Sequence, residues 1–467
     1  MTRTIEINPV TRIEGHATVN IEVGDDGRVA GACMHVLEFR GFERFVKGMQ
    51  VELMPTLTTR ICGTCPHAHH LVGAKTVDKV FGVTPPRAAV LLRELLNCGS
   101  MIHSHAIHFF ALAGPDLLLG LNAPPAQRNL LGLLDAAPEL ATKALRLRTL
   151  GQRICEIVGG RGTHPVTAVA GGMSAALKSD SCATLRGIAT EAVGLAQVAV
   201  AAGKAALGKH EDLLTILPLE VHSLGTVRDG RLDLYDGTLR VCRPDGSVAA
   251  DFPVEEHRQR FFEEAVPYSY AKQLRLRDGA GAGVPYRVGP LARLNCAERI
   301  DTPLAAAELE EFRSRFGRPC HLTVLNHHAR LIELLHCAEK AVALLADDEI
   351  ASPNVRAPIT ATPRPAAAHI EAPRGVLIHD YDVDPNGIMR GANLIVATQH
   401  NMSSINASIK DMAQLALEKP DADLLNHIEF AIRCYDPCLS CSTHQVGSMP
   451  LAIAVTRGGR PVRTVRR

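Results

Sequence analysis

The stretch RICGTCPHAHH, residues 60–70, concentrates two cysteines and three histidines in a short segment. Cys62 and Cys65 form a C-x-x-C pair, and His69 follows four residues later. Pro66 favours the first position of a helix, so we expect a helix to start just after the thiols. Such a pair is typical of half a zinc site, of a redox dithiol or of a less common metal centre. Which of these it is depends on whether the chain supplies a matching half elsewhere.

A matching half stands near the end of the chain, in DPCLSCSTH, residues 436–444. Cys438 and Cys441 repeat the C-x-x-C spacing. Asp436 suits a helix N-cap and Pro437 suits the first helical position, which predicts a helix with both thiols on one face. Both cysteine pairs would then lie near helix N-termini, where amide groups and the helix dipole stabilise thiolates.

The distance along the chain between the two pairs limits the kind of site they can form. Zinc ribbons place their pairs roughly 15–20 residues apart, whereas most of the 467 residues separate Cys65 from Cys438. Closing so long a loop costs roughly 5 kcal/mol plus a constant, so the whole fold must bring the pairs together. Four thiolates suit soft or borderline metals, which include zinc, nickel and iron. From spacing alone, a structural zinc, a metal redox site and unrelated cysteines all stay open.

The composition indicates a large globular protein. Hydrophobic residues make up 46% of the chain, so burial is ample and global disorder is not expected. The formal net charge of +1 gives no indication of nucleic-acid binding, and the basic tail, residues 457–467, is the one local excess of positive charge. No apolar run reaches the ~18 residues of a membrane span, and the N-terminus lacks the apolar core of a signal peptide. Thirteen cysteines, an odd number, indicate reduced thiols and metal ligands in a cytoplasmic protein.

The hydrophobic pattern predicts a mixed α/β (α+β) fold with a core of long helices and peripheral sheets and hairpins. Alternating apolar residues predict strands over residues 4–36, and a strand-rich insert with Asp-Gly turns spans residues 229–252. Residues 347–374 are proline-rich and are predicted to be irregular, and residues 391–401 to be short and extended. Apolar spacing of three to four residues predicts the long helices Arg87–Leu112, Pro138–Val158, Ala183–Leu207, Leu322–Ala346 and Ile405–Leu417.

Five segments resemble the signatures of one family, the large subunit of nickel–iron hydrogenases. They occur in the family's order along the chain, which makes chance agreement negligible and disfavours zinc. The resemblance implies the family's fold, with residues 1–444 as a single large catalytic domain. The segments are RIEGH (residues 12–16), RGFE (40–43), RICGTC with its histidine (60–69), EAPRG (371–375) and the terminal motif (436–444).

This resemblance implies a nickel–iron centre held by the four cysteines. Cys62 and Cys438 would bind nickel terminally, whereas Cys65 and Cys441 would bridge nickel to iron. The iron would carry carbon monoxide and cyanide ligands, which no side chain can supply, so maturation and nickel-insertion proteins are needed. A thiolate, with a free pKa near ~8.5 that falls on a metal, can accept the proton that polarised H2 releases.

The resemblance also implies catalytic roles for charged residues around the metals. Arg374 would lie above the metal pair as a fixed cation, held by the carboxylates of Asp116 and Asp436. Glu14 would transfer protons beside Cys438. This role requires a carboxyl group whose pKa is raised, and burial would raise it.

Further residues would support the centre. His69 would donate a hydrogen bond to a bridging thiolate, and Thr398 would donate one to a cyanide on iron. A second metal, magnesium, would be bound by Glu43, by the backbone carbonyl of Leu394 and by His444. Two or three protein ligands completed by water suit an octahedral hard cation.

The residues after His444 are similar to an extension that large subunits of this family carry until nickel is loaded. A maturation protease would cut between His444 and Gln445 and remove residues 445–467. The new C-terminal His444 could then reach the magnesium, and the last segment could close over the metals. The basic tail would serve maturation and not nucleic-acid binding.

We therefore predict the catalytic large subunit of a cytoplasmic hydrogenase, an enzyme that splits H2 reversibly. The chain has no further clustered cysteines, so a small subunit with iron–sulfur clusters must take the electrons. Segments 104–120, 234–241 and 264–270 resemble the soluble bidirectional class, which uses diaphorase subunits with flavin to reach NAD(P). The alternatives are coupling to heterodisulfide reductase or a deazaflavin, and a hydrogen sensor with the same site. The quinone-facing subunit of respiratory complex I shares the fold but lacks the four cysteines.

Overall fold

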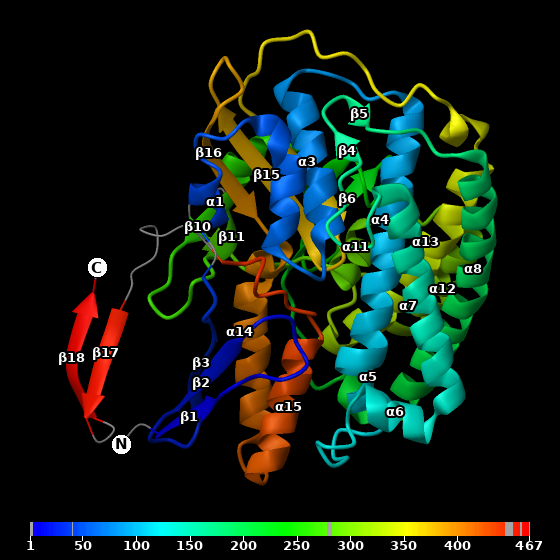
Figure 1. The fold of residues 1–467 in the computed structure, drawn as a ribbon. Coiled ribbons are helices and arrows are strands. Elements are labelled where there is room, and N and C mark those ends of the chain that lie inside the picture. Colours follow the sequence, from blue (N-terminus) through cyan, green and yellow to red (C-terminus); the bar gives the residue numbers. More distant parts are fainter. Residues whose placement is uncertain (1–2, 40, 278–282, 444–451, 458–459, 467) are drawn as a thin grey trace.

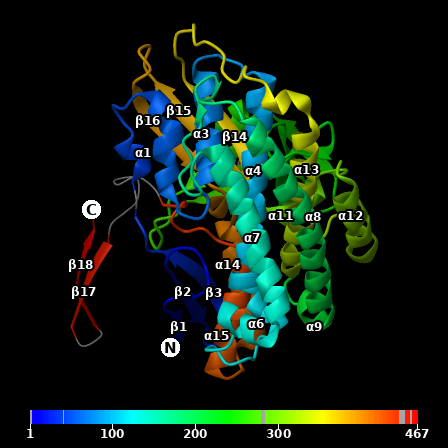
Figure 2. The ribbon, with the colours of Figure 1, turned by 45° about the vertical axis from the view of Figure 1, so that its right-hand side comes forward.

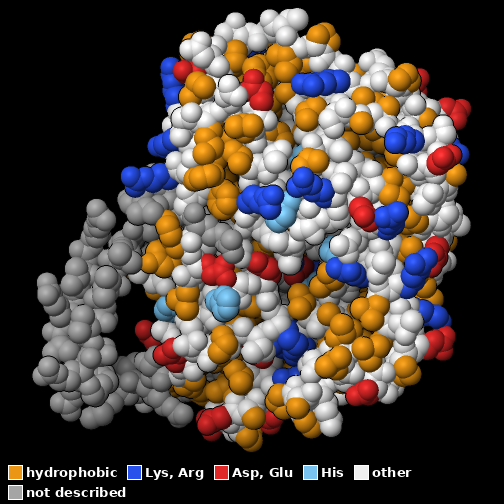
Figure 3. All heavy atoms as spheres, viewed as in Figure 1, with side chains coloured by type: hydrophobic (Ala, Val, Ile, Leu, Met, Phe, Trp, Pro, Cys, Tyr) orange, Lys and Arg blue, Asp and Glu red, His pale blue; other side chains and the backbone are white. Residues whose placement is uncertain are grey.

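The computed structural model describes residues 3–39, 41–277, 283–443, 452–457 and 460–466. Long helices form one side of the molecule, and small β-sheets and hairpins lie on the other side (Figure 1). The predicted mixed α/β fold with a core of long helices is therefore confirmed. On the face in Figure 3, acidic and basic side chains are interspersed with apolar ones.

Four long helices pack side by side in the core (Figure 2). They are α4 (Arg87–Ile107), α7 (Pro138–Gly159), α8 (Ser179–Gly208) and α13 (Asn326–Ala346). α4 packs against α7 and α13, and α8 packs against α13 and α7. A Cβ on Gly151 of α7 would lie 2.5 Å from the backbone nitrogen of His103 on α4, so only glycine permits this close approach. The apolar period predicted all four helices.

α8 is the one helix among the described residues that is long and apolar enough to cross a membrane by length and composition. No continuous apolar run had indicated this in the sequence, because polar residues interrupt its alanine-rich stretch. One face of α8 packs against α13 and α7, and 33% of its most apolar window is buried. Core helices can meet the same criterion, so one such helix is weak evidence for a span.

The N-terminal strands and most strands of the insert fall where the sequence pattern predicted them. The N-terminal sheet consists of β1 (Arg3–Ile7), β2 (Ala17–Val23) and β3 (Val29–Val36). The insert contains β7 (Arg231–Leu232), β8 (Thr238–Cys242) and β9 (Val248–Phe252), and β6 (His222–Arg228), which pairs with β7 and β8, precedes the predicted start of the insert. Several buried side chains of these strands, including Leu224, Leu239, Val241 and Phe252, belong to a second, smaller hydrophobic core.

A third sheet supports the site. It consists of β14 (Ala366–Ala372), β15 (Gly375–Val383) and β16 (Met389–Ile395), all antiparallel. β14 occupies the end of the segment that was predicted to be irregular. The helix α3 (Pro66–Val80) packs on β14 and β15. This contact brings the first C-x-x-C pair next to the EAPRG signature.

The helix that follows this sheet starts earlier than predicted. α14 (Ala397–Ala416) includes residues that were predicted to be extended. Gln399, His400 and Asn401 are buried polar residues in its first turns, and the side chain of Asn401 bonds the backbone of Val288. The apolar period that marks the helix in the sequence therefore begins only at Ile405.

Candidate metal centre

Cys62 and Cys65 are placed by the start of α3. Cys65 directly precedes the helix, and Pro66 occupies its first turn, as the sequence predicted. Cys62 follows the short 3-10 helix η2 (Thr58–Ile61) and has extended backbone. The amide of Thr64 donates to the Cys62 sulfur at 3.3 Å, and such a donor stabilises a thiolate.

The second cysteine pair lies in a turn after α15 (Asp421–Arg433) and not in a helix. Asp436 has a φ of 53°, a left-handed conformation that an N-cap residue does not adopt. The prediction that Cys438 and Cys441 share one helical face is therefore wrong. The turn is held instead by the N-terminal segment, because the amide that follows Cys438 donates to the carbonyl of Glu14 at 3.1 Å.

The fold brings the four thiols into one buried group. Their sulfurs all lie within 4.8 Å of one another. The sulfur of Cys62 is 3.3 Å from that of Cys438, and the sulfur of Cys65 is 3.2 Å from that of Cys441. Within the described residues, no second group of three or more His, Cys, Asp or Glu side chains lies close enough together to hold a metal ion. Such a ligand set suits a soft or borderline metal.

Glu14 lies directly beside this group. Its carboxylate is 3.0 Å from the sulfur of Cys438 and accepts a hydrogen bond from the amide of Ser440 at 3.1 Å. A parallel backbone bridge between Glu14 and Cys438 fixes the distance. Burial raises the pKa of Glu14, and the nearby thiolate of Cys62 acts in the same direction. A carboxyl group of this kind can exchange a proton with a thiol near neutral pH.

Arg374 occupies the tight turn between β14 and β15. Its Nη2 lies 3.1 Å from the carboxylate of Asp436, whereas its Nε and Nη1 find no acceptor among the described residues. Burial lowers the pKa of Arg374, but the charges of Asp436 and of the cysteine thiolates outweigh burial and raise it overall. The guanidinium is thus a permanent buried cation with donors to spare.

Arg293, which no sequence motif singled out, holds the turn that carries Arg374. It lies on α11 (Pro290–Cys296) and is fully buried. Its guanidinium pairs with Glu333 at 2.6 Å and with Glu371 at 2.7 Å. It also donates to the two backbone carbonyls that precede Arg374, at 3.0 and 3.2 Å. All five N–H groups of this arginine therefore have acceptors. The one available signal in the sequence was the glutamate of the EAPRG signature, which needs a cation when buried.

His69 lies within hydrogen-bond distance of a thiol, with its Nε2 3.4 Å from the sulfur of Cys441. Its Nδ1 is 3.1 Å from the Nε2 of His379, and the Nδ1 of His379 is 2.7 Å from the hydroxyl of Tyr381. Burial lowers the pKa of His69 to about 4, which favours a neutral imidazole. The sequence did not indicate His379 or Tyr381.

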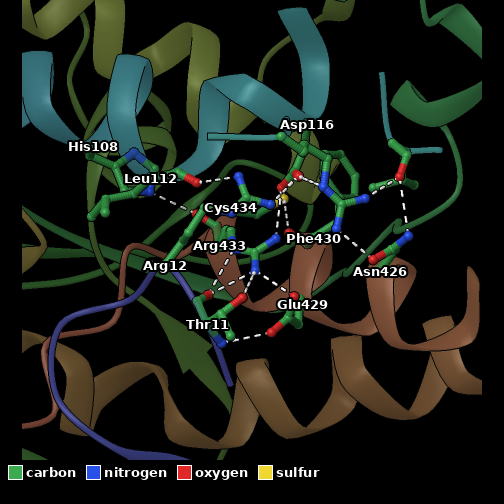
Figure 4. Close-up of polar contacts among 12 residues, drawn as sticks. Thr11, Arg12, His108, Leu112, Asp116, Asn426, Glu429, Phe430, Arg433 and Cys434 are labelled. Carbon is green, nitrogen blue, oxygen red and sulfur yellow. Dashed lines mark hydrogen bonds and ion pairs between the residues drawn. The ribbon is translucent and has the colours of Figure 1, made fainter. Parts of the chain in front are cut away.

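Asp116 does not pair with Arg374 among the described contacts, contrary to the prediction. Its carboxylate, on the short helix α5 (Gly114–Leu118), pairs with Arg433 at 2.9 Å, with Arg128 at 3.2 Å and with Arg12 (Figure 4). These three cations already compensate the charge of the buried carboxylate, and Arg374 is not one of them.

The network around Asp116 fixes the N-terminal segment instead. Arg433 of α15 donates to the carbonyl of Thr11 at 2.8 Å and pairs with Glu429 at 2.6 Å. Glu429 in turn accepts the amide of Thr11 at 2.6 Å. Figure 4 shows these side chains converging from α5, from α15 and from the chain just before Glu14. The network therefore ties Glu14 to the helix that leads into the second cysteine pair.

The remaining predicted site residues are Thr398 beside Cys438, the pair Glu43 and Leu394, and residues outside the described part of the chain. The hydroxyl of Thr398 accepts the amide of Cys438 at 2.8 Å, which leaves its own proton to donate. Glu43 accepts the amide of Leu394 at 3.0 Å, so these two expected magnesium ligands are neighbours. His444, Gln445 and Arg40 lie outside the described residues.

A small cavity of about 20 Å³ opens beside the thiols. It is lined by Cys65, Cys438 and Cys441, by Arg374 and Thr398, and by several apolar side chains. The residues fit a metal group with small ligands: thiolates can bind the ions, and the unpaired donors of Arg374 suit negatively charged ligands on them.

Comparison with known protein families assigns this fold and site. The family described as nickel-dependent hydrogenase matches residues 40–128 and 243–444, and a family described as HoxL-like matches residues 4–39. The chain belongs to the nickel-dependent hydrogenase family, as a large subunit. It is therefore an oxidoreductase, and the predicted family and enzyme class are confirmed.

Individual relatives cover nearly the whole chain. It is 39% identical to one component of the F420-non-reducing hydrogenase vhc of Methanococcus voltae, over 99% of both chains. It is 36% identical to the NAD-reducing hydrogenase HoxS subunit beta of Cupriavidus necator, over 97% of both. A crystal structure of an NAD+-reducing [NiFe]-hydrogenase in the H2-reduced state superposes with a TM-score of 0.90 at 39% identity, covering 95% of this chain and 99% of the other. A Ni-Fe-Se hydrogenase from D. vulgaris Hildenborough shares the fold, with a TM-score of 0.78 at 22% identity, over 95% and 100% of the two chains.

Proposed function

We propose that this subunit cleaves H2 reversibly at a nickel–iron centre and passes the electrons through an iron–sulfur small subunit to NAD(P). The observation that carries the proposal is the group of four buried thiols, with Glu14 beside Cys438 and Arg374 lining the adjoining cavity. When bound, the metal pair supplies the Lewis acidity and the electron acceptance that cleavage of H2 requires. The chain itself binds the metals, excludes water and moves the proton.

Cys62 and Cys438 are the proposed terminal nickel ligands, and Cys65 and Cys441 the bridges to iron. The family resemblance carries this division; both proposed bridging cysteines line the cavity, as the proposed terminal ligand Cys438 does. Iron with carbon monoxide and cyanide ligands would occupy the cavity side. The Thr398 hydroxyl and the unpaired donors of Arg374 would be available there to hold a cyanide.

Glu14 is the proposed group that exchanges protons with Cys438, as their 3.0 Å contact supports. Arg374, held by Asp436, is the proposed fixed cation over the metals. We assign Asp116 to the network that positions the N-terminal segment, since its cations come from Arg12 and Arg433. His69 is the proposed donor to the bridging thiolate.

A magnesium site and C-terminal processing complete the proposed mature enzyme. Glu43 and the carbonyl of Leu394 would bind magnesium together with His444 after a maturation protease cuts the bond to Gln445. The contact between Glu43 and the amide of Leu394 supports this location. Residues 1–444 would then form the single catalytic domain, and nickel-insertion proteins would load the centre first.

Electron transfer requires partner subunits. Four large apolar side chains between residues 37 and 53 are exposed and suit a partner surface: Leu37 (50%), Phe39 (44%), Phe45 (54%) and Leu53 (47%). NAD(P) as the final acceptor, with diaphorase subunits, is supported by the likeness to the NAD+-reducing structure. The relative from Methanococcus voltae favours a second candidate, transfer to an acceptor other than F420. All thirteen cysteines are free, which supports a reducing compartment such as the cytoplasm.

Infrared spectroscopy of the matured complex tests the metal assignment. Carbon monoxide and cyanide on iron absorb where proteins do not, so we expect their bands from the loaded subunit. Their absence after expression with the full maturation system would overturn the assignment. H2-dependent reduction of NAD+ by the same complex then separates the two acceptors. Rapid dye reduction without NAD+ reduction would favour the second candidate, and slow turnover with every acceptor would favour a sensor.

A further inference from the structure

A chain of three buried side chains leads away from Cys441 into the sheet β14–β15–β16. It runs from the Cys441 sulfur to His69 (3.4 Å), from His69 to His379 (3.1 Å) and from His379 to the hydroxyl of Tyr381 (2.7 Å). The two histidines and the tyrosine are all essentially inaccessible to solvent. His379 and Tyr381 both lie on β15 with their side chains on the same face, two residues apart. The strand thus holds the outer two members of this hydrogen-bonded series, His379 and Tyr381, rigidly.

The chemistry of the thiol gives these hydrogen bonds one direction. A cysteine that binds a metal is a thiolate and only accepts hydrogen bonds. The Nε2 of His69 must therefore be a donor, so in a neutral ring its Nδ1 is an acceptor. The Nε2 of His379 must then donate to it, and the Nδ1 of His379 must accept. Tyr381 has the one remaining proton and donates it.

We propose that Tyr381 and His379 are positioning residues that act through His69 to withdraw electron density from the bridging thiolate of Cys441. The inference rests on the proposed function, because it takes Cys441 as a bridge to iron. Each donor in such a chain strengthens the next one, since hydrogen bonds in a low-dielectric interior polarise one another. The chain also fixes the tautomer and the ring plane of His69, as outer partners of metal-site histidines do.

The stretching frequency of iron-bound carbon monoxide reports this electron density. A thiolate that loses polarising donors becomes more electron-rich, and iron then donates more strongly into carbon monoxide and lowers its frequency. The variants are Tyr381→Phe, which removes one hydroxyl, and His379→Met, which removes the donor to His69. We expect the band to move to lower frequency in both variants, and further in His379→Met because this change is nearer to the sulfur.

Tyr286→Phe is the matched control. The hydroxyl of Tyr286 also bonds a buried histidine, His400, but this pair does not belong to the series of hydrogen bonds that reaches Cys441. The carbon monoxide band of the Tyr286→Phe variant should coincide with that of the unsubstituted complex. Identical bands in Tyr381→Phe and the unsubstituted complex, or equal shifts in the control, would overturn the inference.

The same measurement separates failure of the inference from failure of the proposed function. An unsubstituted complex without carbon monoxide bands contradicts the proposed function itself. A Tyr381→Phe protein that stays unloaded while the Tyr286→Phe protein loads also contradicts the inference, because it makes the hydroxyl a requirement for assembly. If the His379→Met protein does not take up the metal centre, the comparison of Tyr381→Phe with Tyr286→Phe tests the inference by itself.

Discussion

At the scale of the residue, Glu14 joins two functions in one position. Its backbone carbonyl holds the turn of the second cysteine pair, and its side chain reaches the sulfur of Cys438. Substitution of the side chain leaves the backbone bond in place. The proton-transfer role can therefore be tested without loss of the metal ligands.

Glu14→Gln should keep the infrared bands of the metal centre and slow proton exchange. Glutamine has the same shape and can still accept the amide of Ser440, but it cannot carry a proton. We expect exchange between deuterium gas and water to fall by roughly 10²- to 10⁴-fold, the usual contribution of general acid–base catalysis. Mass spectrometry of the gas phase measures this rate.

Glu38→Gln is the control for this prediction. Glu38 also bonds Ser440, but at its hydroxyl, with a distance of 2.8 Å. Exchange in this variant should stay close to that of the unsubstituted complex. Unchanged exchange in Glu14→Gln would remove Glu14 from the mechanism.

At the scale of the element, Arg293 joins three parts of the fold. It lies on α11, Glu333 lies on α13, and Glu371 lies on β14. Because both glutamates are fully buried, each needs the arginine to compensate its charge. The turn that carries Arg374 therefore depends on a contact between a helix pair and a hairpin.

Arg293→Lys should destabilise the protein strongly, although it keeps the charge. Lysine has three N–H donors in place of five and cannot form two planar pairs with carboxylates. Removing one partner of a buried pair costs about 3–5 kcal/mol, and lysine leaves part of these contacts unmade, so the unfolding temperature should fall clearly in a thermal scan. An Arg293→Lys variant that unfolds at the temperature of the unsubstituted protein would contradict the stabilising role of the Arg293 pairs.

Arg146→Lys provides the comparison for this variant. Arg146 forms a bidentate ion pair with Glu191, but both side chains are exposed. Exposed pairs contribute little because water and salt screen them. The unfolding temperature should therefore hardly change, and an equally large decrease here would show that the burial of Arg293 is not what matters.

At the scale of the whole molecule, the many buried histidines make the fold sensitive to acid. Burial lowers the pKa of His105 and His336 to about 4, and that of His369 and His400 to about 3. In the unfolded chain a histidine has a pKa of ~6.5. Below this pH the unfolded chain binds protons that the folded chain does not bind, so stability present above pH ~6.5 is lost as the pH falls toward 4.

The unfolding temperature should therefore decrease between about pH 7 and about pH 5. His336→Asn removes one of the responsible groups. The difference in unfolding temperature between this variant and the unsubstituted protein should become smaller at the lower pH. A difference that grows as the pH falls would contradict the assignment of a neutral buried imidazole.

C-terminal processing is also a property of the whole chain. Active enzyme purified from cells with nickel should have the mass of residues 1–444, and protein made without nickel should keep residues 445–467. Intact-mass spectrometry distinguishes the two forms. Full activity from the unprocessed 467-residue chain would contradict this prediction.

The long core helices could be predicted from the sequence, because α4, α7 and α13 show their apolar period directly. The start of α14 could not, since its first turns bury polar residues that bond other parts of the chain. The turn at Asp436 was wrongly predicted as a helix for a related reason. Its side chain pairs with Arg374, so it does not turn back to cap a helix.

The sequence by itself determined the family and the four thiols, because ligand chemistry resides in residue types and their local spacing. Only the tertiary structure decided the partners of the buried charges. Asp116 pairs with Arg12, Arg128 and Arg433, and Arg293 supports the turn of Arg374. A buried charge must be compensated by whatever opposite charge the fold brings to it, and residues that lie far apart in the chain give no sign of that contact in the sequence.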